Sequence, residues 1–255
     1  MTLPLSFYLV SAAAIFLTGL SKSGFGGGLG VVSVPALSLF VEPQFAVAVL
    51  MPILIGIDVI VVWQYRNSWR REVVSAMIPG ALFGLAVGLA TFQWMNVDLI
   101  RFVVGLLALA FVAQHVLECA RAAEHGADGR RGAFVFAAIS GFASYVAHAG
   151  GPPVKGYLLR QRMDKSTFVG TNTVFFFSMN ALKTVSYTFM GLLSFESLMV
   201  SLSVSPVLLV GVLAGTYLHK RVDQRFFTAL VYGFLTLAGA KLLSDSVIAV
   251  LAQQS

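Results

Sequence analysis

The chain has 255 residues, of which 58% are hydrophobic and only 11% are charged. Because a soluble domain is roughly a quarter charged, this composition excludes a soluble enzyme, a disordered protein and a nucleic-acid-binding domain as first interpretations. The net charge of +6 fits the basic cytoplasmic loops of a polytopic membrane protein, and the single cysteine, Cys119, excludes an intramolecular disulfide.

Apolar segments follow one another along the whole chain. A spanning helix needs about 20 apolar residues, and six segments reach that length, at 44–65, 73–93, 98–118, 166–189, 198–218 and 226–250. The segments at 29–41 and 152–160 are too short, and each follows a glycine-rich break. With the apolar stretches before them, at 3–20 and 132–149, we predict two helical hairpins that enter the membrane, break and leave on the same side.

A weak internal repeat relates the two halves of the chain. A shift of 122 residues aligns Asp58 with Asn180, and a shift of 127 residues aligns Gly84 with Gly211. The order and the lengths of the apolar segments agree between the halves as well. We therefore divide the chain into a first transmembrane repeat at 1–120, a cytoplasmic linker at 121–131 and a second, inverted repeat at 132–255.

Lysine and arginine gather in alternate loops, which the positive-inside rule places in the cytoplasm. Each half holds one hairpin and three spanning helices, an odd number of crossings, so the halves must be oppositely oriented. The predicted fold class is an all-α polytopic membrane protein with an inverted-topology repeat, in which each half has one broken, re-entrant helical hairpin plus three spanning helices. Many secondary transporters have this architecture. We expect both termini to be periplasmic, in a bacterial inner membrane. The basic residues of these loops are Arg66, Arg70, Arg71, Arg121, Arg130, Arg131, Arg160, Arg162, Lys165, Lys220, Arg221 and Arg225.

The first break combines a lysine with serines and glycines, a composition suited to an anion. A broken helix exposes backbone N–H groups at the positive end of its dipole, and glycine lets a ligand approach the backbone closely. The alternative is helix packing by glycine, with the lysine extended to the membrane surface. The candidate substrate-binding residues are Ser21, Lys22, Ser23, Gly24, Gly26, Gly27 and Gly28.

The second break offers a histidine that could bind an anion or carry a proton, or simply bond a neighbouring carbonyl. The candidate residues here are Ser144, Tyr145, His148, Gly150, Gly151 and Lys155, together with Asn172 on the following helix. Asn172 could equally hold helices together. The four histidines have no metal-ligand spacing, and we predict neither a metal nor another cofactor.

Asp58 is the only acidic residue well inside a spanning helix. A carboxylate in a membrane is paired, protonated or used in function, so Asp58 is our candidate for proton coupling. The alternative is a structural ion pair with Lys22 or Lys183. We otherwise expect Lys183 and Lys241, nearer the ends of their helices, to extend to the membrane surface.

Glycines at four-residue spacing predict close helix contacts. Gly80, Gly84 and Gly88 form one such face, and Gly211 and Gly215 form another. We favour packing within the monomer for both faces, with a homodimer interface as the alternative.

The chain resembles the sulfite exporter TauE/SafE family over nearly its whole length. The resemblance lies in the early GLSKSGFGGG break, the VPALSLF segment after it, the helix with Pro79 and Gly84, and the HAGGPPVKGYLL break followed by TNTVFFF. It implies a transporter of small anions such as sulfite, a sulfonate or another organic anion.

The predicted function is therefore a secondary transporter, and not an enzyme. It would export a small anionic substrate (sulfite, a sulfonate or a carboxylate) by alternating access around a midplane site at the two breaks, with proton coupling as an added hypothesis. A passive anion channel and a membrane assembly factor are the alternatives. An intramembrane enzyme would need a paired nucleophile and base or a metal cluster, which the sequence does not offer.

Overall fold

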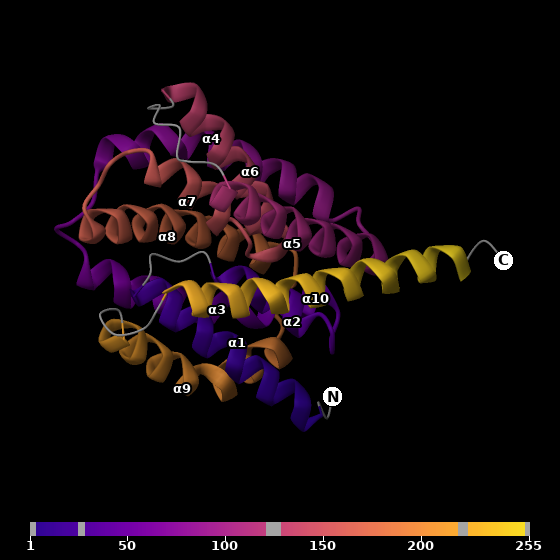
Figure 1. The fold of residues 1–255 in the computed structure, drawn as a ribbon. Coiled ribbons are helices and arrows are strands. Elements are labelled where there is room, and N and C mark those ends of the chain that lie inside the picture. Colours follow the sequence, from indigo (N-terminus) through magenta and orange to yellow (C-terminus); the bar gives the residue numbers. More distant parts are fainter. Residues whose placement is uncertain (1–3, 25–28, 121–128, 219–223, 253–255) are drawn as a thin grey trace.

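In the computed structural model, every regular element of the described residues, 4–24, 29–120, 129–218 and 224–252, is a helix (Figure 1). Each half begins with a long helix, breaks, forms a short helical segment and continues with three long helices. The all-helical prediction is confirmed. The first half contains α1 (Leu5–Gly24), η1 (Leu29–Val32), α2 (Ser33–Leu37), α3 (Pro43–Gln64), α4 (Arg71–Phe92) and α5 (Val97–Ala120). The second contains α6 (Arg130–Ala147), α7 (Gly151–Leu159), α8 (Lys165–Phe189), α9 (Phe195–Leu218) and α10 (Gln224–Ala252).

Five helices of the described part are long and apolar enough to cross a membrane: α1, α3, α4, α5 and α9. Four of them are among the six segments predicted to span, and α1 joins them although we assigned it to a hairpin. α8 has 25 residues but is not among the five. Polar and charged groups on its buried face, such as Asn172, Asn180 and Lys183, lower its hydropathy.

Local sequence sets where the helices beside the second break begin and end. The Asp164 carboxylate caps α8, because it accepts the backbone N–H groups of Ser166 and Thr167 at 3.0 and 3.1 Å. These bonds, above all one from the Thr167 hydroxyl, lower the pKa of the Asp164 carboxyl. At the end of α6, His148 adopts a left-handed φ of 49°, which is uncommon for a residue other than glycine.

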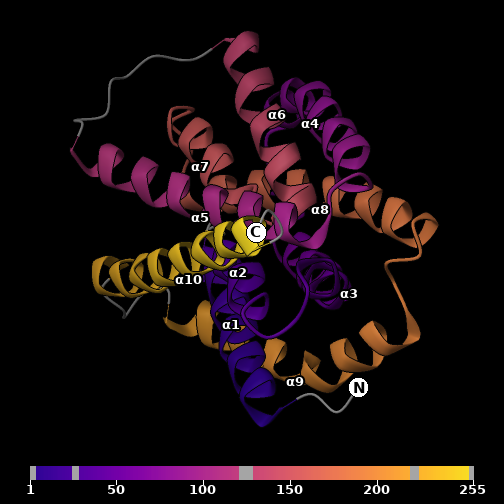
Figure 2. The same cartoon turned by 90° about the vertical axis from the view of Figure 1, so that its right-hand side faces the viewer.

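The long helices form pairs that join the two halves. α1 packs along α9 and α6 packs along α4, so the first helix of each half lies against a helix of the other half. α3 packs against α8, and α5 against α10. The end-on view shows the α4–α6 pair and the α1–α9 pair on opposite sides of the bundle, with α3 and α8 between them (Figure 2).

Glycine lets the helices of the α4–α6 pair and of the α1–α9 pair approach each other closely. A Cβ on Gly84 would lie 2.8 Å from the backbone carbonyl carbon of Ala138 on α6, and a Cβ on Gly211 would lie 2.6 Å from the carbonyl oxygen of Phe16 on α1. Both glycine faces thus pack against helices of the same monomer, which is the alternative that we favoured from the sequence. Gly84 and Gly211 are also aligned by the repeat, so equivalent positions perform the same packing in both halves.

Replacing Gly84 with alanine should destabilise the protein. The new Cβ would meet the α6 backbone, including the amide nitrogen of Phe142 at 2.9 Å, and overpacking of this kind costs about 1–3 kcal/mol. Gly233→Ala is the matched control on α10, because nothing lies within 4 Å of its added Cβ. Thermal unfolding of both variants in detergent measures the difference, and equal melting temperatures would contradict the packing.

Candidate functional site

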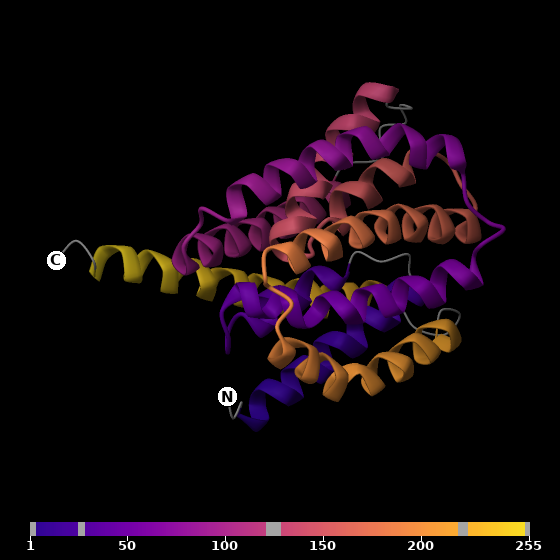
Figure 3. The same cartoon turned by 180° about the vertical axis from the view of Figure 1, so that it is seen from behind.

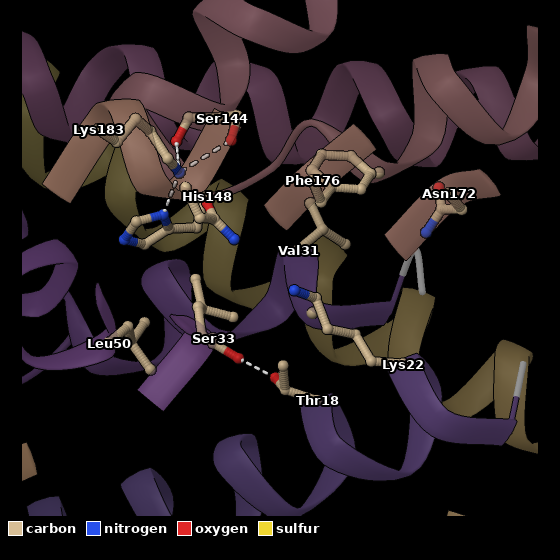
Figure 4. Close-up of a pocket in the computed structure, with 14 residues that line it drawn as sticks. Thr18, Lys22, Val31, Ser33, Leu50, Ser144, His148, Asn172, Phe176 and Lys183 are labelled. Carbon is tan, nitrogen blue, oxygen red and sulfur yellow. Dashed lines mark hydrogen bonds between the residues drawn. The ribbon is translucent and has the colours of Figure 1, made fainter. Parts of the chain in front are cut away.

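A cavity of about 40 Å³ lies between the two halves, beside both breaks (Figure 4). α1, η1, α2 and α3 line it from the first half, and α6, α7 and α8 with His148 line it from the second. A cavity needs roughly 10–15 Å³ to hold one water, so this one has room for about three waters or one small solute. Its lining residues are Thr18, Lys22, Gly30, Val31, Ser33, Leu50, Leu54, Ser144, His148, Gly151, Asn172, Phe176, Asn180 and Lys183.

Positions that the repeat aligns meet at this cavity. Lys22 and Ser144 both line it, and the two positions are 122 residues apart; the same offset relates Leu50 to Asn172 and Leu54 to Phe176. At each of these pairs the chemistry differs between the halves.

Asp58 forms a buried ion pair beside the cavity. Its side chain has no exposed surface; one carboxylate oxygen accepts from Lys22 Nζ and the other from Asn180 Nδ2 at 2.6 Å. Asn180 is the repeat equivalent of Asp58, so the two halves contact each other through equivalent positions. These donors fit an ionised carboxylate in the structural ion pair with Lys22 that the sequence left open. The coupling role of Asp58 stays a prediction.

Lys183 is buried, and the prediction that it extends to the membrane surface is wrong. Only 1% of the residue is exposed, and its Nζ lies 2.9 Å from both the carbonyl and the hydroxyl oxygen of Ser144 and 2.8 Å from Nδ1 of His148 (Figure 4). An ammonium has three N–H donors, and these three acceptors occupy them. None of the three carries a negative charge.

His148 joins the second break to α3. Its Nε2 lies 3.0 Å from the carbonyl oxygen of Val47, and its ring also lies near Tyr187, with centroids 6.1 Å apart. The left-handed backbone at His148 ends α6 and directs the imidazole to the cavity, between Ser144 and the start of α7. This conformation is uncommon for residues other than glycine, and its place at a cavity is typical of a functional site.

Lys22 closes the opposite side of the cavity. Its Nζ lies 5.9 Å from the ring centroid of Phe176, within reach of a cation–π interaction. Thr18 and Ser33 lie beside it and share a hydrogen bond of 2.6 Å (Figure 4). Two lysines and one aspartate thus surround the space, an excess of one positive charge among the described residues that line or contact it.

Five of the predicted site residues line the cavity: Lys22, Ser144, His148, Gly151 and Asn172. Several others serve helix packing instead. The Ser23 hydroxyl donates to the carbonyls of Gly19 and Val212, which joins α1 to α9. A Cβ on Gly150 would lie 2.7 Å from the Ser140 carbonyl oxygen, so this glycine fits α6 rather than a ligand.

Tyr145 points away from the cavity, towards α4 and the end of α8. Its hydroxyl forms a hydrogen bond of 2.6 Å with Ser186, and its backbone carbonyl accepts from Tyr187. Neither Ser21 nor Lys155 is among the lining residues, although both have partners in the structure. Gly24 ends α1, and its surroundings are not described. Gly26, Gly27 and Gly28 lie outside the described residues, as do residues 121–128 of the predicted linker.

Sequence reasoning missed most of the apolar lining and, above all, Lys183. A signal was present, because Lys183 follows Asn180 by three residues, which places both on one face of a helix. Among the described residues, no group of three histidine, cysteine, aspartate or glutamate side chains could hold a metal ion.

The family comparison agrees with this arrangement. The family model described as sulfite exporter TauE/SafE matches residues 11–242, a stretch that contains every residue lining the cavity. The chain belongs to the sulfite exporter TauE/SafE family. This family implies a membrane transporter of sulfur anions rather than an enzyme. Comparisons with curated proteins and with solved structures found no match.

The ion pair at the cavity predicts a dependence between two substitutions. Lys22→Met or Asp58→Asn alone should lower the free energy of unfolding by about 3–5 kcal/mol, because each leaves the other charge buried and unpaired. The double variant should recover much of that loss. Thermal unfolding of the two single variants and the double variant measures the coupling, and additive losses would show that the two charges do not depend on each other.

Proposed function

We propose that this TauE/SafE protein is a secondary transporter that exports a small sulfur oxyanion, sulfite or an organosulfonate, through the cavity between its two halves. The observation that carries the proposal is Lys183, a buried lysine whose three hydrogen-bond acceptors are all neutral. A charge in a membrane interior is costly and usually functional. The excess positive charge left by Lys22, Lys183 and Asp58 would attract an anion into the cavity.

The size of the cavity favours the smallest candidate. Room for about three waters suits sulfite, which has four heavy atoms, better than a longer organosulfonate. Leu50, Leu54 and Phe176 enclose the space with apolar surface. Low polarity around an anion strengthens its attraction to the nearby lysines.

Helix pairing supports alternating access. α1 with α9, and α6 with α4, form two closely packed units on either side of the cavity, and each unit carries one of the two breaks. Rocking of one unit against the other would open the cavity to one side of the membrane at a time, as in other transporters built from repeats. In a passive channel, by contrast, a continuous polar pore would remain open.

The orientation in a bacterial inner membrane, with both termini periplasmic, is part of this proposal. α1 begins and α10 ends at the same end of the bundle, as the views from the front and from behind agree (Figure 1, Figure 3). The loop between α3 and α4 carries Arg66 and Arg70 and lies at the opposite end of α3 from Pro43. The positive-inside rule places that loop in the cytoplasm.

Removal of either cavity lysine should impair transport. We expect Lys183→Met and Lys22→Met to reduce sulfite flux in proteoliposomes by about 10–100-fold, which corresponds to the loss of one charge-assisted interaction of about 1.5–3 kcal/mol. The matched control is Lys241→Met, because that side chain is 60% exposed and pairs with Asp245 at 3.0 Å. Normal flux in a well-expressed Lys183→Met protein would remove this lysine from the site.

Single-cysteine labelling tests the orientation. In a Cys119→Ser background, a cysteine at position 255 should react with a membrane-impermeant maleimide added on the periplasmic side. A cysteine at position 130 should react only after the membrane is permeabilised. The reason is the basic character of the loops on the predicted cytoplasmic side. Labelling of both positions from the same side would contradict the inverted repeat.

A further inference from the structure

Hydrogen-bond roles fix where the proton sits on His148. The Val47 carbonyl oxygen can only accept, so Nε2 of His148 carries the hydrogen and donates to it across 3.0 Å. In a neutral ring the other nitrogen, Nδ1, is then an acceptor, and Lys183 Nζ donates to it across 2.8 Å. The closed arrangement is therefore an ammonium bonded to a neutral imidazole.

A second proton on this imidazole cannot coexist with that bond. A proton on Nδ1 would turn its lone pair into an N–H donor, facing the N–H donor of a second cation. The Lys183–His148 bond must open when the proton binds. Opening leaves Lys183 with its two Ser144 acceptors and frees one of its N–H groups. Both the freed N–H and the new Nδ1–H would belong to residues that line the cavity.

Other titratable or charged groups lie around this pair on the elements packed against it. They are Lys22 from α1, Asp58 from α3, Tyr145 from α6 and Tyr187 from α8. The Asp58 carboxylate already accepts hydrogen bonds from Lys22 and Asn180, and the Tyr187 hydroxyl donates to the Tyr145 carbonyl. Each of these groups already has a partner that fits its charge or polarity. The Lys183–His148 bond joins a cation to a neutral base without a counterion.

We propose that His148 and Lys183 are the proton-binding pair of this transporter and that the anion binds to the opened pair. The proposal rests on the proposed function. One proton from water binds to Nδ1 of His148, the Nζ–H···Nδ1 bond breaks, and the anion accepts from Lys183 Nζ and His148 Nδ1 in its place. A monovalent anion and a proton then cross the membrane together without net charge, so the outward gradient of the anion, and not the inward proton gradient, drives export.

Proton uptake on anion binding tests this directly. The probe is methanesulfonate, because a sulfonate does not titrate near neutral pH and any proton must then bind to the protein. Calorimetric titrations of the purified full chain at pH 8, in two buffers with different heats of ionisation, should give an uptake of up to one proton per bound anion. The dissociation constant should rise about tenfold per pH unit above the pKa of the anion-free pair, by linkage. Binding with no uptake and no pH dependence would overturn the proposal.

Two variants locate the proton. His148→Gln, which cannot titrate, should lose the uptake and bind methanesulfonate with a dissociation constant independent of pH. The control His115→Gln should keep the uptake, since His115 stacks on Tyr232 with ring centroids 4.0 Å apart and does not line the cavity. Uptake that persists in His148→Gln, or that disappears in His115→Gln, would refute the assignment.

The wild-type measurement stands even if His148→Gln fails to fold. Anion binding by the wild type without proton uptake would refute the His148–Lys183 pair and leave the transporter intact. Failure to bind methanesulfonate, sulfite or thiosulfate at all would refute the proposed function, and this inference with it.

Discussion

The buried carboxylate of Asp58 is the constraint on which the rest of the structure depends. A charge inside a membrane needs a partner, and Asp58 has one donor on α1, Lys22, and one on α8, Asn180. Three helices from both halves are thereby held at one point. The same contact sets the position of the last turn of α1 and of the middle of α8, and these two segments supply both cavity lysines and the amide of Asn172. The cavity is therefore a consequence of how this charge is satisfied.

Differences between positions that the sequence repeat aligns explain how the site acquires its charge. Positions 122 residues apart carry lysine and serine, leucine and asparagine, or aspartate and asparagine. Lys22 and Asp58 cancel each other, so the excess charge comes from Lys183, and the residue 122 positions before Lys183 is Val61. Ser144 stands where Lys22 stands in the other half and serves as an acceptor for Lys183. The excess positive charge of the cavity thus arises from the difference between the halves.

Hydropathy and glycine spacing predicted the helices, the breaks and the glycine contacts, because these features depend on residues close together in the sequence. The cavity lining was predicted only in part, because it depends on which face each helix turns inward. Ser21, Lys22 and Ser23 are consecutive, yet among them only Lys22 lines the cavity, while Ser23 bonds to α9. Lys183 was misassigned for the same reason. Its position near the end of its helix suggested that the side chain reaches the membrane surface. Lys183 instead lies on the same buried face of α8 as Asn180.

The contacts inside each helix pair differ in kind from those across the cavity. Within α4–α6 and α1–α9, glycines bring backbones together, and such packing leaves little freedom for either helix to slide. Across the cavity the halves meet through polar bonds, from Asn180 to Asp58 and from His148 to Val47. Polar bonds can be exchanged for bonds to an anion, a proton or water at small net free energy, whereas a glycine contact has no such substitute. The structure therefore places exchangeable interactions at the interface that alternating access would have to open.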